Sequence, residues 1–269
     1  MPPTSVPPPE APEPDASDLG EEITPHESGP RRRSMFSLAH PGLVSPLTLA
    51  FVRHGVTDAT LTHVLSGSSK PGPKLNDEGR AQANTAADAV YRIGRDRWRH
   101  LPRVSRVIAS PMVRTQETGR AIGLRLGIEV ETDDRLREID FGEWEGLTGH
   151  EIAERHGDDI HRWRFGEIPA PEGESIPEVG RRIDGLVTDL AREHAERCVA
   201  GDDDHRLYAL ASHAVAIKSI VALSMGMDLR SWGAIWPRPA STTILEFRVN
   251  REGEVTERHL LCMGETVSS

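Results

Sequence analysis

The stretch Phe51-Val52-Arg53-His54-Gly55 constrains the fold more than any other part of the chain. An apolar run from Leu47 to Val52 stops there at a guanidinium, an imidazole and a glycine. A continuous apolar run of this length predicts a strand that is covered on both faces, as in a parallel sheet. Ligands in open α/β sheets bind beyond the carboxyl ends of such strands, so Arg53 and His54 are candidates for a ligand site. If this stretch is considered alone, the alternative is that His54 has only a structural role at the end of the strand.

Two further apolar runs end in polar residues in the same way. Val104–Ala109, a mainly apolar run around Ser105 and Arg106, precedes Ser110, and Leu207–Ala211 precedes Ser212-His213. Helical patterns follow each run, and strands joined through helices are parallel. We therefore expect the three strand ends to meet at one rim of the sheet, where they would form an anion site with a nucleophile.

The order of predicted elements defines the fold class. Strands alternate with amphipathic helices up to about residue 226, and the strand patterns at 242–249 and 255–261 close the chain as a hairpin. We predict an α/β protein: a three-layer α/β/α sandwich with a mostly parallel central sheet. Thr148 with Glu151, and Ser175 with Glu178, have capping-box spacing and predict the starts of two of its helices.

Residues 1–46 differ in composition from the remainder of the chain. They are rich in proline with scattered Glu and Asp, and they have almost no apolar periodicity. Such a segment cannot bury enough apolar surface to offset the entropy lost on ordering. We therefore expect a disordered, acidic, Pro-rich tail over residues 1–46 and one folded domain over residues 47–269.

Charge and cysteine content restrict the partners. The net charge of −10 argues against nucleic acid, because binding to the phosphate backbone usually needs a basic face. The chain has no signal-peptide pattern and no run of about 18 apolar residues, so we expect no membrane partner and a cytoplasmic location. Cys198 and Cys262 are far apart and form no CxxC pair, which suggests neither a disulfide framework nor a zinc site. The oligomeric state is left open.

Arg114 lies in the first turn of the helix predicted after Ser110. A helix N-terminus with a nearby arginine is a favourable place for a phosphate. On this motif alone, a surface arginine paired with Glu117 or Glu138 is the alternative. The loop 55–75, rich in Gly, Ser and Pro, follows His54 directly, so we expect its backbone N–H groups to meet a bound anion.

Carboxylates are dense in the stretch 136–146, where aromatic and glycine residues separate them. Such a loop can hold one carboxyl group in a partly desolvated place, which would raise its pKa and suit it to acid-base work. The residues alone do not decide which carboxylate this is. Trp232 and Trp236, which precede the closing hairpin, are interpreted as core or lid packing.

With these stretches in order, residues 47–262 resemble the histidine phosphatase superfamily, also called phosphoglycerate-mutase-like. The third stretch is most similar to the branch of alpha-ribazole phosphatases and broad-specificity acid phosphatases. The resemblance is carried by four motifs in family order: Phe51-Val52-Arg53-His54-Gly55 with Thr57; Ser110-Pro111-Met112 with Arg114-Thr115 and Glu117-Thr118; Glu138 with Phe141-Gly142-Glu143-Trp144-Glu145-Gly146; and Ser212-His213.

The resemblance implies a role for each matching residue. His54 would be the nucleophile that becomes phosphorylated, and Glu138 the general acid and then base. The phosphoryl group would be held by two cations, Arg53 and Arg114, and by a second imidazole, that of His213. Loop residues would add phosphate or substrate contacts, at Thr60, Ser66 and Gly67. Fixed side-chain cations can stabilise a transferring phosphoryl group without a metal, so we expect no metal and no other cofactor.

Some positions depart from the family pattern. Val56 replaces the Glu or Gln common after His-Gly, and Thr60 stands where many members have an Asn. We therefore expect a metal-independent phosphomonoesterase that acts on a small phosphorylated metabolite, with the metabolite itself left open. Two alternatives remain: a phosphoglycerate-type mutase, which the segment around Glu138 disfavours, and a weakly catalytic phosphate-binding interaction module.

Overall fold

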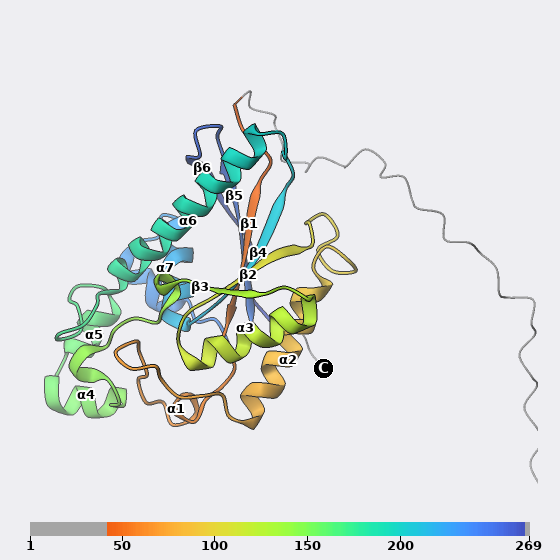
Figure 1. Cartoon of the computed structure of the whole chain (residues 1–269). Helices are drawn as coiled ribbons and strands as arrows, with labels where there is room; N and C mark the ends of the chain where they lie inside the picture. The colour runs from red at the N-terminus through yellow and green to blue at the C-terminus, as the bar shows by residue number, and fades with distance from the viewer. Residues whose placement is uncertain (1–41, 267–269) are drawn as a thin grey trace, which may run out of the picture. The chain divides into compact units, whose positions relative to one another are not determined.

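The structure is a computed structural model that describes residues 42–266. Within them the chain forms a six-stranded sheet with the order β3-β2-β4-β1-β5-β6 (Figure 1). The strands are β1 Leu47–Arg53, β2 Val104–Ala109, β3 Val130–Thr132, β4 Arg206–Ser212, β5 Thr242–Val249 and β6 Val255–Glu265. β3, β2, β4 and β1 run parallel, whereas β5 and β6 form the antiparallel hairpin. The predicted mostly parallel sheet is confirmed.

Helices cover both faces of this sheet. The α-helices are α1 Asp58–Leu61, α2 Asp77–Arg92, α3 Val113–Leu126, α4 Gly149–His156, α5 Asp159–Arg164, α6 Ile176–Val199 and α7 Ala214–Ser224. Short 3-10 turns span Asp134–Leu136, Gly142–Trp144 and Leu229–Ala234. In Figure 1, α2 and α3 lie on one side of the sheet, and α6 and α7 lie on the other.

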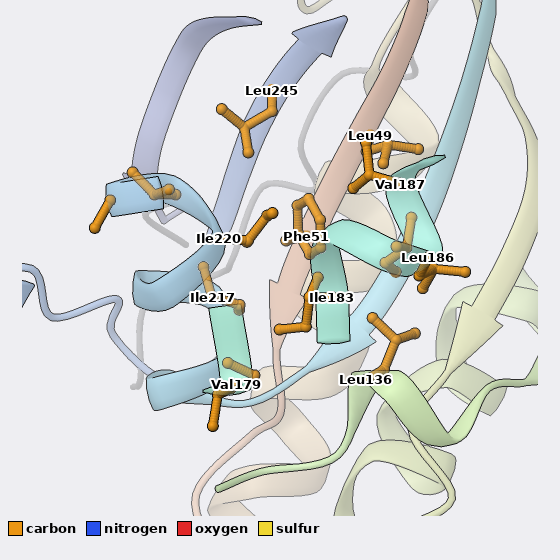
Figure 2. Close-up of a cluster of buried hydrophobic side chains, with 14 of the residues drawn as sticks. Leu49, Phe51, Leu136, Val179, Ile183, Leu186, Val187, Ile217, Ile220 and Leu245 are labelled. Atoms are coloured by element: carbon orange, nitrogen blue, oxygen red, sulfur yellow. The ribbon is translucent and has the colours of Figure 1, made fainter. Parts of the chain in front are cut away.

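The central strand β1 explains why its sequence is apolar without interruption. Leu49 and Phe51 face the core beneath α6 and α7, where Ile183 and Ile217 pack around Phe51 (Figure 2). The intervening Ala50 and Val52 face the second core, beneath α2 and α3. Because successive side chains of a strand point to opposite faces, a strand covered twice must be apolar at every position. The three-layer sandwich is therefore confirmed.

Local signals place the helix starts. The Thr148 and Ser175 hydroxyls accept from the backbone N–H of Glu151 and Glu178, and both predicted capping boxes are present. The segment 55–75, expected to be a loop, contains the four-residue helix α1. Its N-cap Thr57 forms a capping box with Thr60 at N3, and this Thr-Thr pair is a weaker sequence signal than the Glu or Gln usual at N3.

The predicted disordered tail covers residues 1–46, and its first 41 residues lie outside the part of the chain that the structure describes. Residues 43–46, which composition assigned to the tail, pair with the domain. The Val44 N–H donates to the Val249 carbonyl at 3.0 Å. The Ser45 N–H donates to Asp203 at 2.7 Å, and the Ser45 carbonyl accepts from the His194 ring at 2.7 Å. Leu43 and Val44 supply apolar β-pairing residues that the composition of the whole proline-rich segment obscures. Within residues 42–266, no helix is long and apolar enough to cross a membrane.

Candidate active site

The carboxyl ends of β1, β4 and β2 lie side by side at one rim of the sheet. Arg53 pairs in register with Ser212, and Ala109 with Ala211. The His54 N–H donates to the Ser212 carbonyl at 3.0 Å, and the Ser110 N–H donates to the Ala211 carbonyl at 3.0 Å. The three strand ends therefore deliver Arg53-His54, Ser110 and Ser212-His213 to one place, where the sequence predicted that they would meet.

His54 is buried, with 5% of its surface exposed. Its Nδ1 donates to the Gly55 carbonyl at 2.7 Å, and its Nε2 accepts from Arg114 Nε at 3.2 Å. Because a carbonyl can only accept, the neutral ring carries its hydrogen on Nδ1 and has its lone pair on Nε2. Burial, together with the guanidinium groups of Arg114 and Arg53, holds the pKa of His54 well below its ordinary value. The imidazole is therefore uncharged at neutral pH, the state in which a histidine nitrogen can act as a nucleophile.

Arg114 is fixed by contacts from the loop that follows β1. Its Nη2 donates to the carbonyls of Ser66 at 3.0 Å and Gly67 at 3.2 Å. Gly72 has a φ of +80°, and a Cβ at that position would collide with Arg114 Nη1, so glycine leaves the guanidinium its space. Burial lowers the pKa of Arg114 from its ordinary value, although nearby carboxylates oppose this. An arginine remains charged in such an environment.

Arg53 is the last residue of β1 and directly precedes His54. Its Nη1 donates to the Pro237 carbonyl at 2.8 Å, which anchors the guanidinium to the segment before β5. Its Cζ also lies 5.7 Å from the centroid of the Trp236 ring. Burial lowers the pKa of Arg53, and the Glu138 carboxylate opposes that shift.

His213 is the N-cap of α7 and is fully buried. Its ring lies edge to face against His54, with the ring centroids 5.2 Å apart. His213 Nε2 lies 2.8 Å from Ser110 Oγ, which also accepts from the Met112 N–H at 3.4 Å. The Ser110 hydroxyl hydrogen is thus free to point at His213 Nε2, which leaves Nδ1 as the protonated ring nitrogen. Burial and then Arg114 lower the pKa of His213 well below its ordinary value.

Three polar atoms of this cluster are buried without a hydrogen-bond partner in the described part of the chain: Arg53 Nε, Arg114 Nη1 and His213 Nδ1. An unpaired buried donor costs roughly 1–3 kcal/mol. Neither Arg53 nor Arg114 has a carboxylate within ion-pair distance among residues 42–266. Two guanidinium donors and one neutral imidazole donor, all unpaired and close to His54, are the arrangement expected of an anion site, because a bound oxyanion would accept from all three.

Glu138 approaches the cluster from the carboxylate-rich loop. It is 6% exposed, and its carboxylate accepts backbone N–H bonds from Ile139 at 3.0 Å, Val215 at 3.3 Å and Ala216 at 3.2 Å. Two of these N–H groups belong to the first turn of α7, so the helix N-terminus holds the carboxylate beside His213. Arg182 of α6 donates to the carbonyls of residues 135, 137 and 138 and fixes the loop from outside.

The same loop contains a second candidate carboxyl group. Burial raises the pKa of Glu145, and bonds from the Gly67 N–H and the charge of Arg114 act in the opposite direction. Its two oxygens lie 3.0 and 2.9 Å from Gly67 N. Sequence reasoning predicted a carboxyl group of raised pKa here and left its identity open.

Thr60, Ser66 and Gly67 are the loop residues for which phosphate or substrate contacts were predicted, and the structure shows their contacts within the chain. The Ser66 and Gly67 carbonyls accept from Arg114 Nη2, and the Gly67 N–H donates to Glu145. The Thr60 hydroxyl is engaged with Thr57 in the capping box of α1, at 3.2 Å from Thr57 N. Ser66 and Gly67 therefore help to orient Arg114, and Thr60 caps α1, while the phosphate or substrate contacts expected of these three residues stay a prediction.

Lys218 and Trp236 were not singled out as site residues by sequence reasoning. Lys218 sits in the apolar pattern of α7, and its ammonium lies 5.6 Å from the Trp236 ring centroid. Trp236 was interpreted only as packing. Both residues adjoin the cluster, since the same indole also lies against Arg53. Among the described residues, no group of three or more His, Cys, Asp or Glu side chains could hold a metal ion.

The fold and the imidazole-guanidinium cluster are shared with a known family. Residues 49–258 match the Histidine phosphatase superfamily (branch 1). The chain therefore belongs to the histidine phosphatase superfamily.

The chain is similar to several mycobacterial proteins, including a named phosphatase. Bifunctional protein Rv2228c of Mycobacterium tuberculosis is 32% identical over 182 residues, which are 67% of this chain and 45% of that protein, so the chain spans less than half of this relative's length. The Glucosyl-3-phosphoglycerate phosphatase of Mycobacterium tuberculosis is 30% identical over 189 residues, 70% of this chain and 79% of that enzyme. A solved mycobacterial glucosyl-3-phosphoglycerate phosphatase in complex with VO3 aligns with a TM-score of 0.69 and 26% identity, covering 81% of this chain and 99% of that one.

Proposed function

We propose that this chain is a metal-independent phosphomonoesterase that hydrolyses a small phosphorylated metabolite through a phosphohistidine at His54. The observation that carries the proposal is the set of unpaired buried donors, Arg53 Nε, Arg114 Nη1 and His213 Nδ1, around a neutral imidazole. A phosphoryl group bound there would accept from all three donors. A transferring phosphoryl group spreads negative charge over its oxygens, so donors that are already in place stabilise the transition state without reorganising.

In the first step, His54 Nε2 forms a bond to phosphorus while the bond from phosphorus to the leaving oxygen breaks. The leaving oxygen takes a proton from the carboxyl group of Glu138, which becomes a carboxylate. Arg114 Nε is 3.2 Å from His54 Nε2, so its guanidinium is within reach of a phosphoryl group on that nitrogen. The Gly55 carbonyl, which accepts from His54 Nδ1, stabilises the positive charge that the ring gains on phosphorylation.

In the second step, water attacks phosphorus and the bond between phosphorus and Nε2 breaks. The Glu138 carboxylate takes the proton that the water loses, and inorganic phosphate leaves. His54 returns to its neutral form and Glu138 to its carboxyl form, so each group ends the cycle as it began. One carboxyl group can serve in both steps because the leaving oxygen and the attacking water take the same position in turn.

Relatives named as phosphatases support a hydrolase. A neighbour solved with VO3 supports an oxyanion site on this fold. We also propose a cytoplasmic location, and the proposal leaves the metabolite open. The mutase alternative differs in one respect, since a mutase returns the phosphoryl group to an organic acceptor and releases no phosphate.

The proposal is tested by measuring inorganic phosphate released from a panel of phosphorylated metabolites. The matched control is His54→Asn, which keeps a polar side chain at the strand end and cannot form a phosphohistidine. We expect phosphate release by the wild-type chain and none above background by the variant. Transfer of phosphate to an organic acceptor without release would indicate a mutase. Binding of phosphomonoesters without turnover would indicate the phosphate-binding module.

A further inference from the structure

A cavity of about 340 Å³ adjoins the phosphoryl site. Its walls come from α5, α7 and the segment before β5, and its lining residues are Ile160, Trp163, Arg164, Lys218, Gly233 and Trp236. Trp236 joins the cavity to the site, because its ring centroid lies 5.7 Å from Arg53 Cζ and 5.6 Å from Lys218 Nζ. A molecule whose phosphoryl group meets Arg53 therefore needs to extend only past one indole ring to reach Lys218.

Lys218 is the unusual member of this lining. It is 2% exposed, yet it has no carboxylate within ion-pair distance in residues 42–266. Its Nζ lies 5.8 Å from the centroid of the Trp163 ring and 5.6 Å from that of the Trp236 ring. Burial lowers the pKa of Lys218 to about 8, and the charge of Glu138 opposes this. A buried ammonium without an anion is costly, and a bound anion would offset that cost.

The chemistry of the other lining groups narrows that partner. Arg164, Lys218 and the two tryptophans can only donate hydrogen bonds, and the lining offers no side-chain acceptor. Trp163 Nε1 is also buried without a partner among the described residues. A group held here must therefore accept hydrogen bonds, and two cations favour one that is negatively charged. The indole faces and Ile160 require an otherwise apolar body.

We propose that this cavity holds the leaving group of the substrate and that Lys218 recognises a carboxylate on that leaving group. A carboxylate fits this cavity better than a second phosphate does. The cavity offers one buried ammonium and one exposed arginine to balance the negative charge, whereas the phosphoryl site has two buried arginines. This inference rests on the proposed phosphatase function and adds a substrate class to it: carboxylated phosphomonoesters. Lys218 would act on binding and orientation and would take no part in the bond changes at phosphorus.

The test compares phenyl phosphate with 4-carboxyphenyl phosphate, which differ only by the carboxylate. The wild-type chain should have the higher kcat/KM on the carboxylated substrate. Lys218→Met keeps the apolar stem and removes the charge, so it should lower kcat/KM for 4-carboxyphenyl phosphate by about 10- to 100-fold, the range expected for one charged hydrogen bond. Its kcat/KM for phenyl phosphate should change less than about 3-fold, since that substrate makes no such bond.

Two further variants control the comparison. Lys218→Arg keeps the charge and should retain the preference for the carboxylated substrate. Arg120→Met removes an exposed cation from α3, away from the cavity, and should leave the kcat/KM of both substrates unchanged. Unaltered turnover of phenyl phosphate by Lys218→Met also demonstrates that the variant is folded.

The outcomes separate the two levels of the proposal. Equal losses on both substrates in Lys218→Met, or a wild-type chain that does not prefer the carboxylated substrate, would overturn the role of Lys218 and leave the phosphatase function standing. A higher kcat/KM of the wild type on a matched bisphosphate than on the carboxylated substrate would overturn the assignment to a carboxylate. Failure of the wild-type chain to hydrolyse any of these esters would overturn the phosphatase function, and this inference with it.

Discussion

Arg114 Nε donates to His54 Nε2 across 3.2 Å, from the first turn of α3 to the end of β1. Because Arg114 can only donate, this contact means that His54 Nε2 carries the lone pair, and it holds a permanent positive charge beside that nitrogen. A substitution of Arg114 should therefore leave the nucleophile in place and remove one stabilising charge. We expect Arg114→Ala to lower kcat/KM by about 10²- to 10³-fold, as for the loss of one preorganised donor, whereas His54→Ala should reduce activity to background.

Steady-state kinetics on the preferred ester measure this difference. Arg114→Lys is the matched control, because it keeps the charge and loses the forked geometry, and it should fall between Arg114→Ala and the wild type. Equal activity in Arg114→Ala and wild type would mean that this guanidinium does not contact the phosphoryl group.

The pH dependence of His54 follows from its burial. Burial and the charges of Arg114 and Arg53 lower the pKa of this imidazole well below its ordinary value, so it stays neutral as the pH falls through about 6.5. Because only the neutral ring attacks, activity should persist into mildly acidic solution. Titration of the ring by NMR, assigned with His54→Asn, measures the pKa without interference from the ionisation of the substrate. A midpoint at or above about 6.5 would contradict the proposed environment.

The ordered residues before β1 make a prediction about stability. Val44 is 8% exposed, and Ser45 bonds Asp203 and His194. A chain that begins at Gly42 should keep the kcat/KM of the full chain. A chain that begins at Leu47 should lose about 2–4 kcal/mol of unfolding free energy through the lost burial and hydrogen bonds. Urea unfolding of the two shortened chains provides the comparison, and equal midpoints would argue against a structural role for residues 43–46.

Metal removal tests where the positive charge comes from. If the guanidinium groups of Arg53 and Arg114 supply it, hydrolysis should continue in excess EDTA. Vanadate should inhibit competitively, because its oxygens can occupy the positions of the transferring phosphoryl group. Loss of activity with chelator and rescue by a divalent ion would assign the enzyme to a different mechanism.

The strand-end residues could be predicted from sequence because topology alone brings them together. The apolar runs before His54, Ser110 and His213 predict parallel strands, and parallel strands end at one rim. Arg114 follows from the same reasoning, since the helix after a strand starts at that rim. The two-sided burial of β1, with Leu49 and Ala50 in different cores, is likewise encoded in its uninterrupted apolar run.

Other features depend on contacts between distant segments. Glu138 is held by N–H groups of residues 215 and 216, a pairing that the density of carboxylates in its loop cannot specify. Lys218 was overlooked because the residues around it in α7 are apolar, a pattern typical of core packing. The family resemblance implied phosphate or substrate contacts for Ser66 and Gly67, and it could not show that their carbonyls accept from Arg114, because that contact depends on how the loop folds.

The acid-base role separates Glu138 from Glu145. An alkyl phosphate needs its leaving oxygen protonated, whereas para-nitrophenyl phosphate leaves readily as an anion. Glu138→Gln should therefore lose most of its activity on the alkyl ester, while its His54 is still phosphorylated by the nitrophenyl ester. The matched control Glu145→Gln removes the neighbouring carboxyl group and should hydrolyse both esters without accumulating an intermediate. If Glu145→Gln shows the substrate-dependent loss instead, the acid-base role belongs to Glu145.

Rapid-quench mass spectrometry of Glu138→Gln mixed with para-nitrophenyl phosphate tests the phosphohistidine most directly. The account predicts a burst of nitrophenol close to one equivalent per chain, followed by slow turnover. An acid-labile phosphate should appear on the peptide that contains His54, and it should be absent from the double variant with His54→Asn. Steady release of nitrophenol by Glu138→Gln with no phosphate on His54 at any time would contradict the covalent mechanism.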